Sequence, residues 1–124
     1  MSMSGKIGSR SAACPWGRDL RDLVTVTPGQ RIAYVTDIAD TPANRAAVVA
    51  LSRNADVLFI EAAFAQQDEE LARERRHLTT AAAGQIARRA GARRVEPFHF
   101  SSRYPGEEER LLAEVRAAFS GSAT

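Results

Sequence analysis

Short apolar runs that alternate with helix-like segments constrain the fold of this chain most strongly. The runs Arg31–Thr36, Val57–Ile60 and Arg93–Phe98 have the length and residue types of strands, and segments with helical spacing lie between them. Strands that alternate with helices form mainly parallel sheets, because each helix carries the chain back to the starting edge of the sheet. We therefore predict an α/β fold with a mainly parallel sheet and flanking helices.

Turn and capping residues set the bounds of the remaining elements. Leu23–Thr27 reads as a strand, and Pro28-Gly29 after it suits the tight turn of a hairpin with the next strand. Thr41-Pro42 and Thr79 suit helix starts, and Gly91 suits a helix end. The predicted helices are residues 41–53, a short charged helix from Asp68, residues 79–90, and Glu107–Phe119.

Length and composition indicate one small domain. We expect residues 1–22 to be a poorly ordered lead-in whose Trp16 docks on the domain, residues 23–120 to form the domain, and residues 121–124 to be a tail.

Cys14 is the only cysteine, which excludes an intrachain disulfide and favours a reducing, cytoplasmic setting. No apolar stretch approaches the roughly 20 residues that span a bilayer. The net charge of +2 argues against a generic nucleic-acid-coating protein, but leaves room for RNA on a local patch.

Polar residues that suit chemistry follow the predicted strands. Asp37, Glu61 and His99 each come directly after a strand, and His77 precedes a helix. Because the carboxyl ends of parallel strands meet at one edge of the sheet, we expect these four side chains to converge there.

Asp37 and His99 are the candidate metal ligands, since carboxylate and imidazole are groups that bind zinc. A carboxylate such as that of Asp37 can bridge two cations, and its alternative is to cap a turn, with Asp40 as a spare acid. The alternative for His99 is a core histidine satisfied by the backbone. We expect His99 to face the side of its strand opposite to Phe98 and Phe100.

Glu61 and His77 are the candidate catalytic pair. Glu61 ends an apolar strand, where an unpaired carboxylate is costly, and a carboxylate can orient an imidazole for proton transfer. The alternative is that Glu61 pairs with an arginine among residues 73–76 and that His77 is a helix-capping surface residue.

Arg103 and Tyr104 follow His99 and are candidate substrate-binding residues. The guanidinium group of Arg103 can bind phosphate with two hydrogen bonds, or can form a structural ion pair. Cys14 reads as a lead-in residue rather than a nucleophile. The pairs Arg88-Arg89 and Arg93-Arg94 read as solvated surface, although they can also help to hold an RNA backbone.

Four motifs in order resemble the second half of ribonuclease Z and its relatives in the metallo-β-lactamase superfamily. The resemblance covers residues 29–119, with Ser102 where the family usually has proline. The motifs are Pro28–Asp37 for the bridging aspartate, Ala55–Ala62 for the acidic partner, His77–Ala87 for the general-acid histidine, and Phe98–Tyr104 for the last metal ligand. The family's first-half motif His-x-His-x-Asp-His is absent from this sequence. The motif needs three histidines, and this sequence has two.

The resemblance implies half of a metallo-β-lactamase αβ/βα sandwich. It implies a zinc-dependent phosphodiesterase with two ions in the complete site, and a tRNA precursor as the RNA substrate of the full enzyme. Asp37 and His99 would then hold metal, and Glu61 and His77 would handle the proton of the leaving group. We expect the chain alone to be incomplete and inactive, and to form a homodimer or to pair with a complementing N-terminal half. The alternatives are another hydrolase of the superfamily that acts on small esters or phosphodiesters, and a non-enzymatic interaction module.

Overall fold

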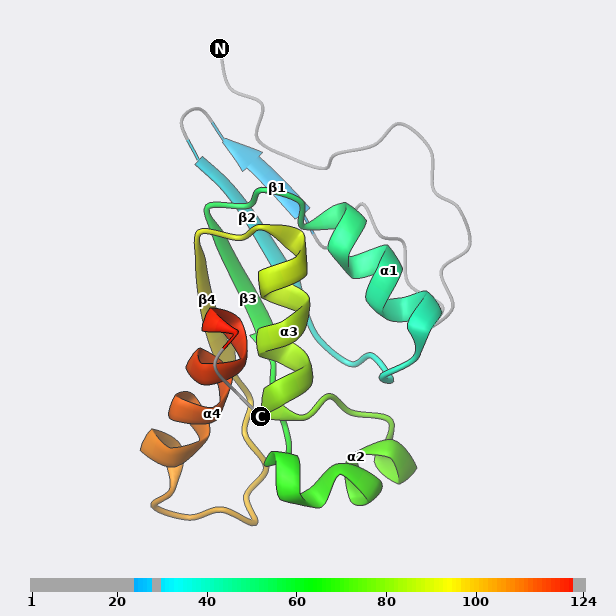
Figure 1. Cartoon of the computed structure of the whole chain (residues 1–124), viewed down its shortest axis with the longest axis vertical. Coiled ribbons are helices and arrows are strands. Elements are labelled where there is room, and N and C mark those ends of the chain that lie inside the picture. The colour runs from blue at the N-terminus through cyan, green and yellow to red at the C-terminus, as the bar shows by residue number, and fades with distance from the viewer. Residues whose placement is uncertain (1–23, 28–29, 122–124) are drawn as a thin grey trace.

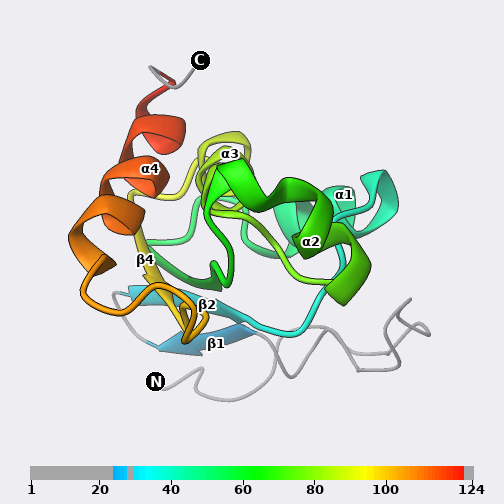
Figure 2. The same cartoon turned by 90° about the horizontal axis from the view of Figure 1, so that it is seen from below.

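A four-stranded sheet with helices on one side forms the body of the molecule (Figures 1 and 2). The structure is a computed structural model that describes residues 24–27 and 30–121. The predicted lead-in with Cys14 and Trp16, the Pro28-Gly29 turn and residues 122–124 lie outside the described residues. None of the helices in the described part of the chain is long and apolar enough to cross a membrane.

The sheet has the strand order β1-β2-β3-β4. Strand β1 (Val24–Thr27) pairs antiparallel with β2 (Gln30–Val35), as the predicted hairpin requires. Strand β2 pairs parallel with β3 (Val57–Glu61), and β3 pairs parallel with β4 (Arg94–Phe98). Three parallel strands with flanking helices confirm the predicted fold class.

The helices begin and end at the residues that suit capping. Helix α1 (Pro42–Leu51) starts after Thr41, whose hydroxyl accepts from the backbone N–H of Asn44 at 3.1 Å. Helix α3 (Thr80–Ala90) starts after Thr79 in the same way and ends at Gly91 in the left-handed conformation. The other helical elements are the 3₁₀ turn η2 (Gln66–Asp68), α2 (Glu69–Arg75) and α4 (Glu108–Ser120).

The core lies between the sheet and the helices. Alternate residues of the strands point toward the helices, and the central strand contributes the fully buried Leu58 and Ile60. Helices α3 and α4 pack closely at Gly84, where an added Cβ would lie 2.4 Å from the carbonyl oxygen of Val115. A second cluster of buried residues, which includes Phe64, Tyr104 and Leu111, lies beneath the segments that follow β3 and β4.

Candidate functional site

The segment that follows β3 holds together the two parts of the chain that carry histidine. On one side, Ala62 N–H donates to Phe98 at 3.1 Å, and Ser101 N–H donates to Ala63 at 2.8 Å. On the other side, Thr80 N–H donates to the carbonyl of Phe64 at 2.8 Å. These backbone bonds fix the loop after β4 and the start of α3 against the end of the same central strand.

Left-handed backbone turns the chain at the site. Asp37 and His99, just past the ends of β2 and β4, have φ of 57° and 63°, and Arg76, which precedes His77, has φ of 59°. Non-glycine residues adopt this conformation only when the surrounding structure holds them there, and such residues gather at functional sites. His99 therefore lies beyond the strand, so the prediction that it alternates with Phe98 and Phe100 along one strand is wrong.

Glu61 is the centre of the site and is 1% exposed. Its Oε2 lies 2.6 Å from Nδ1 of His77, and its Oε1 lies 2.8 Å from Nδ1 of His99. The hydroxyl of Thr36 donates to Oε1 at 3.0 Å. One buried carboxylate thus accepts from three donors on three different segments.

These donors keep the carboxylate ionised. Burial raises the pKa of Glu61, but the hydrogen bonds from His99, His77 and Thr36 outweigh burial and hold the pKa below its ordinary value. Because an ionised carboxylate can only accept, Nδ1 of each imidazole carries a proton. Nε2 of each ring is then left for a metal ion or for proton transfer.

The predicted pair of Glu61 and His77 is present in the structure. The arginines of residues 73–76, which were the alternative partners, form no ion pair with Glu61 among the described residues. The alternative of a core histidine at position 99 does not hold, because the His99 side chain is 62% exposed. Thr36 is a positioning residue that the sequence analysis missed, and its only signal was a hydroxyl directly before Asp37.

The donor set fits a divalent metal ion in type. Asp37, Glu61 and His77 each offer an atom within 4.8 Å of the others, and carboxylate and imidazole suit zinc. Glu61 already accepts from three donors, so it suits the role of orienting the histidines better than that of a ligand. The donors that remain are the exposed Asp37 and the Nε2 atoms of His77 and His99, and these groups are of the types that bind zinc.

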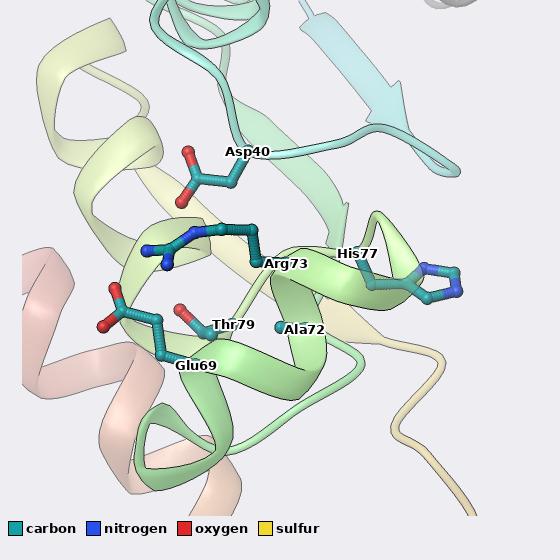
Figure 3. Close-up of a pocket in the computed structure, with 6 residues that line it drawn as sticks. All are labelled: Asp40, Glu69, Ala72, Arg73, His77 and Thr79. Atoms are coloured by element: carbon teal, nitrogen blue, oxygen red, sulfur yellow. The ribbon is translucent and has the colours of Figure 1, made fainter.

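Two small hollows flank His77. One holds about 30 Å³ beside Asp40, Glu69 and Arg73, and the His77 imidazole points away from those side chains (Figure 3). The other holds about 240 Å³, and His77 and His99 both line it. The imidazole of His77 is thus turned toward the side of the site that His99 shares.

Arg103 and Tyr104 lie outside the carboxylate cluster. Tyr104 is 5% exposed, its hydroxyl donates to Asp68, and Ala65 N–H donates to that hydroxyl at 3.0 Å. Arg103 is exposed, and no ion pair between described residues involves it. Substrate binding by these two residues stays a prediction, and the geometry of Tyr104 indicates a structural role in this chain.

The other charged candidates are surface groups. Asp40 pairs with Arg45 at 2.5 Å, so it does not act as a spare for Asp37. Arg93 lies 3.7 Å from Asp56, and Arg94 lies 3.0 Å from Glu96. Arg88 and Arg89 are exposed in the last turn of α3.

Comparison with known proteins identifies the family. The family described as the beta-lactamase superfamily domain matches residues 22–100. The chain is 47% identical over 106 residues to ribonuclease Z of Thermobifida fusca, covering 83% of this chain and 31% of the relative. It is 45% identical over 102 residues to ribonuclease Z of Kineococcus radiotolerans, covering 82% and 31%. The chain thus spans about a third of the length of these curated relatives.

Solved structures agree with this assignment. The metallo-β-lactamase fold protein YhfI of Bacillus subtilis superposes with a TM-score of 0.67 at 24% identity, over 78% of this chain and 37% of that protein. The short form of human tRNase Z superposes with a TM-score of 0.58 at 29% identity, over 64% and 30%. The chain therefore belongs to the beta-lactamase superfamily and corresponds to part of a ribonuclease Z-like protein of the metallo-β-lactamase fold.

Proposed function

We propose that this chain supplies the proton-transfer pair and part of the metal shell of a ribonuclease Z-like, zinc-dependent endonuclease that processes tRNA precursors at the 3′ end. The observation that supports this proposal most directly is the single buried carboxylate of Glu61, which fixes both histidines of the chain. The identity to ribonuclease Z relatives supports the substrate class. The single cysteine is consistent with a cytoplasmic site of action, which is also a proposal.

His77 would transfer the proton to the leaving oxygen. Glu61 accepts from Nδ1 of His77, so Nε2 is the nitrogen that would take up a proton and pass it to the leaving oxygen. The negative charge of Glu61 stabilises the protonated imidazole before transfer and keeps its orientation afterward. In this assignment Thr36 and Glu61 are positioning residues, and His77 is the catalytic residue.

Asp37 and His99 would hold metal. Both are exposed next to the cluster, and because Nδ1 of His99 faces Glu61, its Nε2 is the nitrogen available to a metal ion. Zinc, when bound, acidifies water and stabilises negative charge on a phosphoryl group. Because a catalytic zinc ion usually has three protein ligands, we expect the remaining ligands to come from outside this chain.

The side of the sheet that no described helix covers is the proposed contact with the rest of the site. Tyr34 is 48% exposed and stacks on Phe98 at 4.9 Å between ring centroids, with Phe59 beside it at 6.2 Å. The described helices all lie on the other side (Figure 2). We propose that a complementing N-terminal half, or a second copy of the chain, covers this side.

A chimera tests the assignment of roles. The matched segment of Thermobifida fusca ribonuclease Z is replaced by this chain, and cleavage of a tRNA precursor and zinc content are measured. We expect activity from the chimera and none from the chain alone. His77→Ala should lower kcat by about 10²–10⁴-fold with zinc content unchanged, as for a general acid. Asp37→Ala and His99→Ala should each lose zinc.

Two outcomes would contradict the proposal. The first is a folded, zinc-loaded chimera that cleaves no RNA, and a panel of small esters and phosphodiesters would then identify a different hydrolase. The second is equal loss of zinc from all three variants, because the division between a proton donor and metal ligands would then be wrong.

A further inference from the structure

Arg75 lines the same hollow as the two histidines. The hollow holds about 240 Å³, well above the roughly 10–15 Å³ that a cavity needs to hold one water molecule. It lies between the end of α2 and the loop after β4. Its lining residues are Ala63, Phe64, Arg75, His77, His99 and Ser101.

Of the two arginines in α2, Arg75 lines this hollow. Arg73 instead lines the other hollow beside His77, between the carboxylates of Asp40 and Glu69 (Figure 3). Among the described residues, no hydrogen bond or ion pair involves the side chain of Arg75, which is exposed at the last residue of α2. Its charge is therefore available to a ligand in the hollow.

The other walls suit a phosphate ester. Ser101 offers a hydroxyl whose oxygen accepts from Arg103 N–H at 3.3 Å, so that its proton remains for a ligand. Ala63 and Phe64 form an apolar wall for the sugar or base that carries the phosphate. The acid in the neighbouring cluster, Glu61, is 1% exposed and turned to its own donors.

We propose that Arg75, with Ser101, binds a backbone phosphate of the substrate next to the one that is cleaved, and so positions the scissile bond before His77. This inference rests on the proposed function, because it names how the same site holds a polynucleotide. A guanidinium group binds a phosphate through two parallel hydrogen bonds, which fixes direction as well as position. Arg75 is thereby a substrate-binding residue and not a ligand of the metal.

Titration of the full chain tests the proposal without catalysis. The chain has two histidines, so the imidazole C–H signals of His77 and His99 are simple to resolve and to assign with single variants. The probes are inorganic phosphate and the dinucleotide uridylyl-uridine, added with a chelator present so that metal cannot bind the probe. We expect saturable shifts of both signals with each probe.

Three variants isolate the contribution of Arg75. Arg75→Gln should weaken binding of both probes about tenfold, the loss expected for a charge-assisted hydrogen bond. Arg75→Lys should bind each probe with an affinity between those of the wild type and Arg75→Gln. Lysine keeps the positive charge but cannot form the two parallel hydrogen bonds of a guanidinium group. Arg53→Gln removes an equal exposed charge beyond the end of α1, at the opposite end of the sheet, and should bind like the wild type.

The outcomes separate this inference from the proposed function. Binding by Arg75→Gln as tight as that of the wild type, or no saturable shift in the wild type, would overturn the phosphate site, even with an active chimera. Shifts with inorganic phosphate but none with uridylyl-uridine would show a site for free phosphate. That result would overturn the assignment to a polynucleotide. Phosphate and dinucleotide binding that depends on Arg75 would support the site even if the chimera were inactive.

Discussion

Glu61 decides the protonation state of both histidines. Each of its oxygens faces an Nδ1 atom, and Oε1 also accepts from Thr36. The carboxylate has no proton to donate, so both rings must donate from Nδ1. A buried acceptor with this arrangement costs free energy when any of its donors is missing.

Glu61→Gln should therefore change the tautomer of one histidine. The amide of glutamine has one oxygen and one NH₂ group, so one Nδ1 would face a donor and would have to accept. That ring would move its proton to Nε2. We expect long-range ¹H–¹⁵N spectra to show two Nδ1–H rings in the wild type and one Nε2–H ring in the variant.

Thr36→Val is the matched control for this change. It removes the third donor to Glu61 but keeps the carboxylate, so both rings should remain Nδ1–H. If both histidines kept the wild-type tautomer in Glu61→Gln, the conclusion that Glu61 sets the tautomers of both rings would be wrong.

At the scale of elements, α3 and α4 pack through a glycine. An added Cβ at Gly84 would lie 2.4 Å from the carbonyl oxygen of Val115, 2.6 Å from Cβ of Ala118 and 2.9 Å from the backbone nitrogen of Phe119. Two of these three atoms belong to the backbone of α4, so they cannot move without shifting the helix. The close approach buries the apolar side of α4 against α3, since Val115 is fully buried.

Gly84→Ala should lower the free energy of unfolding by about 1–3 kcal/mol, the usual cost of overpacking. This loss should appear although alanine favours a helix by about 1 kcal/mol over glycine. Arg89→Ala, at an exposed position of α3, should stay within about 0.5 kcal/mol of the wild type. Urea unfolding measures the free energy of unfolding of both variants. A Gly84→Ala variant as stable as the wild type would mean that α4 can shift to accommodate the added methyl group without cost.

Tyr104 joins the loop after β4 to the turn η2. Burial raises the pKa of Tyr104, and its hydrogen bond to Asp68 adds to the rise above the ordinary value of 10.0. The folded state thus holds the phenolic proton more tightly than the unfolded state does. The stability from this group is fully present below the ordinary pKa and is lost as pH rises through the folded pKa.

Tyr104→Phe should lower the free energy of unfolding by about 1–3 kcal/mol at neutral pH, because Ala65 N–H loses its acceptor. The wild type should lose this advantage as pH rises above about 10, near the ordinary pKa of the phenol. Denaturant unfolding from pH 8 to pH 11 measures the difference between the two proteins. A constant difference across this range would contradict the assigned role of the phenolic proton.

At the scale of the whole molecule, the sheet has one side packed on helices and one side that carries aromatic residues. Tyr34 lies opposite Phe59 in the pairing of β2 with β3. Phe98, at the end of β4, lies opposite Glu61 of β3, and its ring stacks on that of Tyr34 at 4.9 Å between centroids. Soluble monomers rarely expose apolar patches larger than a few hundred Å². This side therefore suits a contact with another chain or with the remaining part of a longer protein.

We expect the chain alone to self-associate at micromolar concentration through this side. Tyr34→Lys should weaken association and reduce the binding of a hydrophobic dye, whereas Tyr34→Phe, which keeps the apolar contact, should behave like the wild type. Sedimentation velocity measures the association. A wild-type monomer at every concentration, without dye binding, would contradict the prediction.

The sequence by itself determined the order and bounds of the elements within one or two residues. Strand composition, the caps Thr41 and Thr79 and the stop at Gly91 are local signals, and local backbone preferences suffice to read them. The sequence also placed Asp37, Glu61 and His99 together, because parallel strands bring their carboxyl ends to one edge.

Only the tertiary structure decided how those side chains meet. The double contact of Glu61 with His77 and His99 depends on left-handed turns at Arg76 and His99 and on backbone bonds between segments far apart in the chain. The hollow beside Arg75 and the burial of Tyr104 depend on the same packing. The contacts of Glu61, the hollow and the burial of Tyr104 do not follow from residue type and spacing. Each depends on which distant segments pack together and exclude water.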